Sequence, residues 1–257
     1  MLRLAAFAAF GLVFGSFLTV VIYRVPRGEG LGGRSKCPHC GRQVRAWENV
    51  PLLSFLALRG RCRGCGTRIS FEYPVTEAAT AALFVLAALV FEELAVAVLG
   101  AAFLAVMLAL AVIDARWRIV PNRIVYPALA TSLVAILVLD LVGTNLSVLR
   151  GLGAMAAYGG PLLAIAVAVP RGMGMGDVKL AGLIGLVAGS VGIANVVVAA
   201  AVGIIGGGLG GVVALAVFRV GRKQQMPFGP YLAAGGGVGL LAGPAIARAY
   251  LSITGIS

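Results

Sequence analysis

The chain has 257 residues, of which 60% are hydrophobic and 12% are charged, and its mean hydropathy is +1.02. Soluble domains are about 45–50% apolar and about 25% charged, so this composition excludes an ordinary soluble protein. The net charge is +12. We attribute it to basic loops on the cytoplasmic side of a membrane, where Lys and Arg collect, and we expect no nucleic-acid partner.

Runs with little or no charge predict an all-α polytopic membrane protein with about eight transmembrane helices, since a helix needs about 20 apolar residues to cross a bilayer. Residues 180–218 carry no charge and are long enough for two spans, with a turn near residues 189–195. The first run is a retained helix, because no cleavage site of small residues follows it before Arg24. The single spans are predicted at residues 4–23, 73–91, 94–113, 124–139, 151–169 and 231–247.

The basic residues predict the orientation of these spans. Eighteen of the 21 Lys and Arg residues fall in four segments that alternate along the chain and therefore share one side of the membrane. Because basic loops stay in the cytoplasm, we expect that side to be cytoplasmic and the amino terminus to be outside. The four segments are residues 24–73, 114–123, 170–179 and 219–228.

Two carboxylates lie at the cytoplasmic ends of predicted spans. Asp114 follows the third span, and Asp177 follows glycines at 172, 174 and 176, which leave the backbone open to an extended peptide. Two such aspartates that share a proton can hydrolyse a peptide, one activating water and the other polarising the carbonyl. The simpler alternative is neutralisation in place, of Asp114 by Arg116 or Arg118 and of Asp177 by Lys179.

Two Cys-x-x-Cys-Gly motifs lie in the large predicted loop. They comprise Cys37, Cys40, Cys62 and Cys65, a pattern typical of tetrahedral zinc. Four thiolates close the coordination shell, so the ion would be structural and would supply much of the folding energy of the loop. Two alternatives are a pair of disulfides, which a reducing cytoplasm disfavours, and His39 as a replacement ligand.

Other motifs indicate structure more than chemistry. Glycines at 206, 207, 208, 210 and 211 and at 235, 239 and 243 form overlapping GxxxG patterns, typical of closely packed membrane helices. Glu77 lies in the first turn of the second span. It is either a carboxylate favoured by the helix dipole or a functional group.

The ordered set of motifs resembles the type IV prepilin peptidases (leader peptidase/N-methyltransferase), a GxGD-type aspartic protease family. The motifs are FGSFLTVVIYRVP at 14–26, ENVPLLSF at 48–55, LRGRCRGCGTRISFEYPVTE at 58–77, Asp114 with Pro121, GMGDVKL at 174–180 and MPFGPYLAAGG at 226–236. The resemblance implies that Asp114 and Asp177 are the catalytic pair and that Gly174, Gly176 and Lys179 belong to the active-site loop. Thr19 and Asn122 are small departures from the pattern.

The resemblance further implies that the substrates are prepilins or pseudopilins, cut after the glycine that ends a basic leader. Bifunctional members then methylate the new amino terminus with S-adenosylmethionine. Candidates for orienting that amine are Glu48, Glu72 and Glu77. The domains expected are a first transmembrane helix, a cytoplasmic zinc-binding domain associated with methyl transfer and a transmembrane peptidase core, at residues 1–23, 24–73 and 74–257.

Two further classes compete with a bacterial inner-membrane peptidase. Paired membrane carboxylates also serve as proton relays in transporters, but these favour acids near the midplane and inverted repeats, whereas both aspartates end spans and no repeat is visible. A non-catalytic assembly protein with a zinc module would have a dispensable Asp pair.

Overall fold

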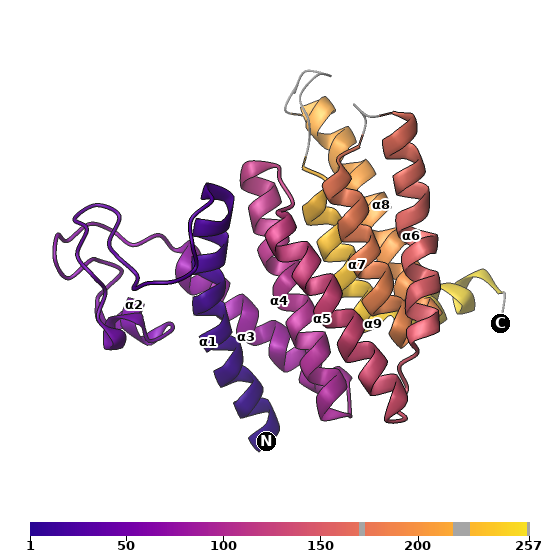
Figure 1. Cartoon of the computed structure of the whole chain (residues 1–257), viewed down its shortest axis with the longest axis horizontal. Coiled ribbons are helices and arrows are strands. Elements are labelled where there is room, and N and C mark those ends of the chain that lie inside the picture. The colour runs from indigo at the N-terminus through magenta and orange to yellow at the C-terminus, as the bar shows by residue number, and fades with distance from the viewer. Residues whose placement is uncertain (170–172, 218–226, 256–257) are drawn as a thin grey trace. The chain divides into compact units, whose positions relative to one another are not determined.

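The computed structural model describes residues 1–169, 173–217 and 227–255, and these residues are predominantly helical (Figure 1). Residues 172 and 226, which belong to two of the predicted motifs, lie outside the described residues. The segment between the first two long helices holds two short 3-10 turns, η1 (Val25–Arg27) and η2 (Ala46–Asn49), and the short helix α2 (Leu53–Ala57). The long helices are α1 (Leu2–Arg24), α3 (Glu72–Val90), α4 (Leu94–Trp117), α5 (Asn122–Leu141), α6 (Val148–Ala168), α7 (Met175–Val191), α8 (Ile193–Val217) and α9 (Gly229–Thr254).

The helical lengths fit a bilayer. Among the described residues, seven helices are long and apolar enough to cross a membrane, namely all the long ones except α7. Helix α7 has 17 residues, and it is buried continuously from Leu180 to Ser190. The predicted break in the long uncharged run is confirmed, because α7 ends at Val191 and α8 begins at Ile193. The all-α polytopic membrane fold is therefore confirmed.

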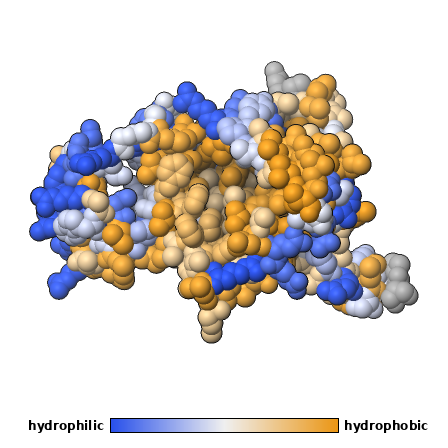
Figure 2. Space-filling model, turned by 60° about the horizontal axis from the view of Figure 1, so that its bottom comes forward, coloured by the Kyte–Doolittle hydropathy of each residue, from blue (hydrophilic) through white to orange (hydrophobic). Residues whose placement is uncertain are grey.

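The surface has the distribution expected of such a protein. Hydrophobic side chains cover much of the helical surface in Figure 2, whereas hydrophilic side chains gather over the segment between α1 and α3. Large apolar side chains are exposed on most of the long helices, among them Phe10, Val134 and Leu209. Soluble proteins rarely expose apolar patches of this extent, so this surface faces lipid.

The chain forms two compact units, Met1–Ala105 and Val106–Ser257, with the boundary inside α4. In the first unit, α1 packs against α3 through small residues. A Cβ atom added to Gly11 would lie 2.6 Å from the Cα of Ala81, and one added to Gly15 would lie 2.7 Å from the Cα of Glu77. Glycine at both positions lets the two backbones approach closely. The domain limits predicted at residues 23 and 73 stay a prediction.

In the second unit, α9 packs on α8 through the predicted GxxxG pattern of Gly235, Gly239 and Gly243, called the glycine ladder below. Cβ atoms added to Gly235 and Gly239 would collide with the carbonyl oxygens of Ala199 and Asn195. The Asn195 side chain donates hydrogen bonds to the carbonyl oxygens of Gly239 (2.9 Å) and Leu240 (3.1 Å). Close helix packing at residues 235–243 is thus confirmed, and a buried amide reinforces it.

The second glycine set makes a different kind of contact. Added Cβ atoms at Gly207 and Gly210 would meet the rings of Phe228 and Tyr231, whereas an added Cβ at Gly208 would have nothing within 4 Å. These glycines therefore make room for aromatic side chains at the beginning of α9.

The ladder predicts that Gly239→Ala lowers the free energy of unfolding by about 1–3 kcal/mol, because the new methyl group overpacks the α8 backbone. Gly208→Ala is the matched control and should be neutral or slightly stabilising, since it faces open space in a helix. Denaturant unfolding of the purified protein, followed by circular dichroism, measures both. Equal effects of the two substitutions would contradict the packing.

Candidate active site and zinc site

Asp114 lies near the end of α4 and is buried, with 5% of its surface exposed. The backbone N–H of Gly229, the first residue of α9, donates a hydrogen bond of 2.9 Å to its Oδ2 atom. A Cβ at residue 229 would lie 2.7 Å from the same oxygen. Only glycine therefore lets this amide reach the carboxylate. A buried carboxylate needs such a partner, because burying it without a hydrogen bond is costly.

Asp177 lies in the first turn of α7, where the helix dipole favours a negative charge. Its backbone N–H donates to the carbonyl oxygen of Gly174 at 3.1 Å, and a Cβ at Gly174 would lie 3.5 Å from its Oδ2 atom. The side chain is half-buried. Glycine at position 174 thus keeps a side chain away from this oxygen of the carboxylate.

The beginning of α7 packs against the connection that follows α4, and this contact brings the two aspartates near each other. A Cβ at Gly176 would lie 2.8 Å from the Cβ of Val120. The Lys179 ammonium donates to Oδ1 of Asn122 at 2.8 Å and lies over the ring of Tyr126 at 5.0 Å. Asp114 and Asp177 interact electrostatically in this arrangement.

The simpler interpretation of the two aspartates was that a nearby basic side chain neutralises each of them, and these contacts test it for Lys179. Lys179, the local partner considered for Asp177, binds Asn122 and Tyr126. The partner that the structure provides for Asp114 is the amide of Gly229. Two carboxylates whose charges interact can hold one proton between them and act as acid and base together.

Gly229 was not predicted as part of this site. The sequence signal was its place between Phe228 and Pro230 in the quoted MPFGPY motif. Its partner Asp114 lies 115 residues earlier in the chain. Spacing alone cannot reveal such a contact.

The four predicted cysteines lie together, with all their Sγ atoms within 4.8 Å of one another. The Sγ atoms of Cys37 and Cys65 are 3.8 Å apart, and the four cysteines are not joined as disulfides. Tetrahedral zinc with Zn–S bonds of about 2.3 Å places its sulfur atoms about 3.8 Å apart. The geometry therefore fits one zinc ion held by four thiolates.

The two Cys-x-x-Cys motifs form matching turns. The N–H groups of Gly41 and Gly66 donate to the carbonyl oxygens of Cys37 and Cys62, and both glycines have positive φ, 69° and 72°. Residues with a side chain rarely adopt this backbone conformation, and this explains why a glycine follows each motif. A side-chain hydrogen bond with Thr67 lowers the pKa of Cys65 to about 6, toward the thiolate that binds metal. Desolvation and hydrogen bonds with the other three cysteines raise the pKa of Cys40 to about 11.

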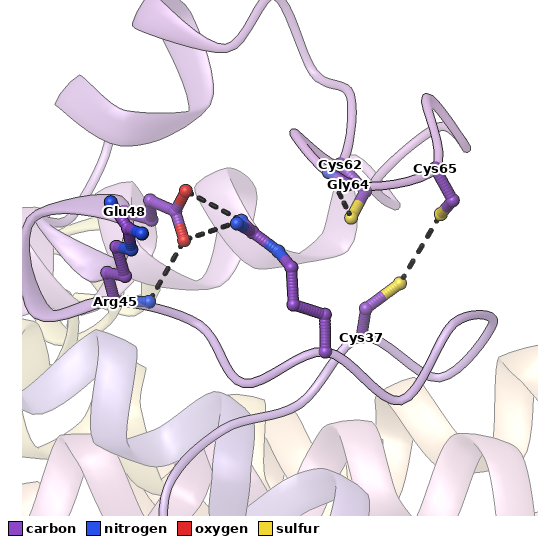
Figure 3. A network of polar contacts seen from close by, with 7 residues as sticks. Cys37, Arg45, Glu48, Cys62, Gly64 and Cys65 are labelled. Carbon is purple, nitrogen blue, oxygen red and sulfur yellow. Dashed lines mark hydrogen bonds and ion pairs between the residues drawn. The ribbon is translucent and has the colours of Figure 1, made fainter.

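Glu48 is linked to this cluster through Arg42 (Figure 3). The Arg42 guanidinium donates to both carboxylate oxygens of Glu48, at 2.6 and 2.8 Å, and the backbone N–H of Arg45 donates at 2.9 Å. The hydrogen bond from Arg45 and then the one from Arg42 lower the pKa of Glu48. The stem of Arg42 lies against Gly64, where a Cβ would be 3.1 Å away. One arginine therefore connects both cysteine turns to η2.

The other two candidate glutamates belong to α3. Glu77 is buried, and its Oε2 atom accepts a hydrogen bond of 2.9 Å from the backbone N–H of Leu52. Glu72 is the first residue of α3 and is half-buried. Glu48 and Glu77 thus have separate partners. Through its hydrogen bond with Leu52, Glu77 attaches the connection before α2 to α3, the second transmembrane helix.

Comparison with known proteins identifies the family. Residues 9–91 match the bacterial peptidase A24 N-terminal domain, and residues 101–212 match the type IV leader peptidase family. The chain belongs to the type IV leader peptidase family. Curated relatives named prepilin leader peptidase/N-methyltransferase include those of Burkholderia pseudomallei strain 1026b, 35% identical over 94% of this chain and 86% of the relative, and Bacillus subtilis strain 168, 34% identical over 95% and 96%. No solved structure matches.

Membership of the leader peptidase family confirms the resemblance carried by the motifs. It disfavours the proton-coupled transporter, because the relatives that cover most of this chain are named as peptidases and methyltransferases. The second family region holds both Asp114 and Asp177, and the first holds the four cysteines and the three candidate glutamates.

The sulfur geometry predicts about one zinc ion per chain, and it predicts that Cys37→Ser removes it. His39→Ala is the matched control and should keep the metal, because His39 is exposed and lies outside the cluster that the described residues form. Elemental analysis of the purified protein measures both. Full zinc in Cys37→Ser, or loss of zinc in His39→Ala, would contradict four-cysteine coordination.

Proposed function

We propose that the chain is a bifunctional prepilin leader peptidase and N-methyltransferase. It cleaves the basic leader of type IV prepilins or pseudopilins after a glycine and then methylates the new amino terminus. The observation that carries the peptidase is the approach of α7 to the connection after α4, where Gly176 meets Val120 and two carboxylates interact. The names of the relatives supply the substrate class and the second activity.

In the proposed cleavage, Asp114 and Asp177 share one proton. The ionised carboxylate takes a proton from water, whose oxygen attacks the scissile carbonyl carbon, while the protonated carboxyl group donates to the carbonyl oxygen. The C–N bond then breaks as the first carboxyl group returns its proton to the leaving nitrogen. The second takes back the hydroxyl proton, and the pair regains its starting state.

The glycines near the pair give the substrate access. Gly174 is exposed, so an extended peptide can approach Asp177 there without meeting a side chain at that position, whereas Gly176 packs against Val120. Gly229 orients Asp114 through its amide. Lys179 holds the beginning of α7 to α5 through Asn122, and it thereby fixes the position of Asp177 relative to Asp114.

For methylation, S-adenosylmethionine supplies an electrophilic methyl group when it is bound. The protein must hold the new amine in line with that group and accept a proton from it. Glu48, Glu72 and Glu77 are the carboxylates we propose for this work or for its support. Both oxygens of Glu48 bind Arg42, so Glu48 acts by organising the domain, with zinc as the structural ion at Cys37, Cys40, Cys62 and Cys65.

We place the protein in the bacterial cytoplasmic (inner) membrane, with its amino terminus outside and its catalytic side toward the cytoplasm. The distribution of the basic residues supports this orientation, since 18 of 21 fall in the four segments on the catalytic side. The partners are then membrane lipid and prepilins or pseudopilins. Nucleic acid is not among them.

The proposal predicts that Asp114→Asn and Asp177→Asn each abolish cleavage of a prepilin by the purified protein in lipid, a loss of at least about a thousandfold, because neither amide can exchange the proton. Glu93→Gln is the matched control. It replaces an exposed carboxylate at the other end of the helices and should keep full activity. Electrophoresis of the processed and unprocessed prepilin measures the rate.

Cleavage that persists in either Asn variant would contradict the aspartyl pair. A wild-type protein that does not cleave prepilins, although it is folded and holds zinc, would favour the non-catalytic assembly protein instead.

The Arg42–Glu48 link predicts that Glu48→Gln reduces methylation more than cleavage, because a neutral amide weakens the bidentate contact that joins η2 to the cysteine turns. Glu29→Gln, an exposed carboxylate of the same segment, is the control. Transfer of a labelled methyl group and leader cleavage are measured on the same samples. Equal loss of both activities would contradict a role confined to the cytoplasmic domain.

A further inference from the structure

We infer that α2 and Phe71 insert into the cytoplasmic leaflet and anchor the zinc domain to an anionic membrane surface. The anchor surface consists of Leu53, Leu56 and Phe71, whose exposed fractions are 66%, 70% and 74%. The Phe71 ring packs against Phe55 of α2, with centroids 5.4 Å apart. An aromatic contact therefore joins the residue before α3 to α2, and Leu53 and Leu56 add exposed apolar surface on the same short helix.

The connection to Glu77 sets the depth of this surface. The N–H of Leu52, directly before α2, is bound to Glu77, which lies five residues after the beginning of α3 at Glu72. With a rise of about 1.5 Å per residue, the Glu77 backbone lies about 7.5 Å along α3 from Glu72, and its side chain holds Leu52 there. Interfacial helices bury their apolar face about 5–10 Å into the headgroup and acyl boundary.

The length of α3 fits this placement in the bilayer. The Arg3 guanidinium at the beginning of α1 donates to the carbonyl oxygens of Phe91 and Glu92, at the end of α3. From Glu72 to Phe91 the rise is about 28 Å, close to the hydrocarbon thickness of about 30 Å. If Phe91 marks the outer boundary, this length puts Glu72 at the cytoplasmic boundary and Glu77 inside it. The hydrogen bond to Glu77 then holds Leu52, directly before α2, near the same level.

The charge beside the anchor surface fits anionic lipid. Arg59, Arg61 and Arg68 are exposed and follow α2 closely in the chain. The segment of residues 24–73 holds ten Lys and Arg against three Glu. Basic residues beside an apolar surface bind anionic headgroups near the membrane. A second occupant, the apolar segment of a prepilin, gains nothing from these arginines, since its leader is itself basic.

The test uses Leu56→Trp, labelled with fluorotryptophan, in nanodiscs of phosphatidylethanolamine and phosphatidylglycerol. A lipid with a spin label near the carbonyl end of its acyl chain should broaden the fluorine resonance of the new indole at least about twofold more than that of Leu31→Trp. Leu31 is an exposed apolar residue of the same segment that lies outside α2. Leu53→Trp repeats the measurement if Leu56→Trp does not fold.

Three results would overturn the inference. The first is equal broadening of the Leu56→Trp and Leu31→Trp resonances. The second is broadening that disappears when a prepilin peptide is added, which would assign the surface to substrate. The third is broadening that stays the same when phosphatidylcholine replaces the anionic lipid, or when Arg59 and Arg61 are changed to Gln. Loss of broadening in these last two arms supports the anchor.

Discussion

The site depends on one contact, in which the backbone N–H of Gly229 reaches the buried carboxylate of Asp114 near the end of α4. A buried aspartate in a membrane bundle is costly, and it is retained only where a fixed donor meets it. Here the donor is the amide of Gly229, which begins α9 at the position where a side chain would collide with Asp114. Gly176 does the same for α7 against Val120. Two absent side chains thus allow α4, α7 and α9 to meet, and the carboxylates gather where they meet.

The cytoplasmic segment is organised by polar links more than by a core of its own. Arg42 joins the cysteine turns to Glu48, and Glu77 joins the residue before α2 to α3. A segment of about fifty residues buries little apolar surface of its own. The attachment of Leu52 to Glu77 stabilises it, and a zinc ion at the four cysteines would add to that.

The sequence predicts those features that depend on local pattern. Uncharged runs locate the spans, the turn at Gly192 divides the longest run, and the spacing of Cys37, Cys40, Cys62 and Cys65 places four sulfurs in one cluster. Features that depend on distant pairs were not predicted. Gly229 meets Asp114, and Leu52 meets Glu77, across 115 and 25 residues. The candidate glutamates carried no local signal of their partners, since Arg42 binds Glu48 through a turn shaped by the cysteines.

The most direct test of the account is a structure of the protein in lipid with a non-cleavable prepilin peptide, in which a hydroxyl-bearing carbon replaces the scissile carbonyl. The account predicts that this hydroxyl group lies between Asp114 and Asp177, within about 2.6–3.2 Å of an oxygen of each. A peptide bound so that its hydroxyl group contacts one carboxylate alone, or neither, would contradict hydrolysis by this pair.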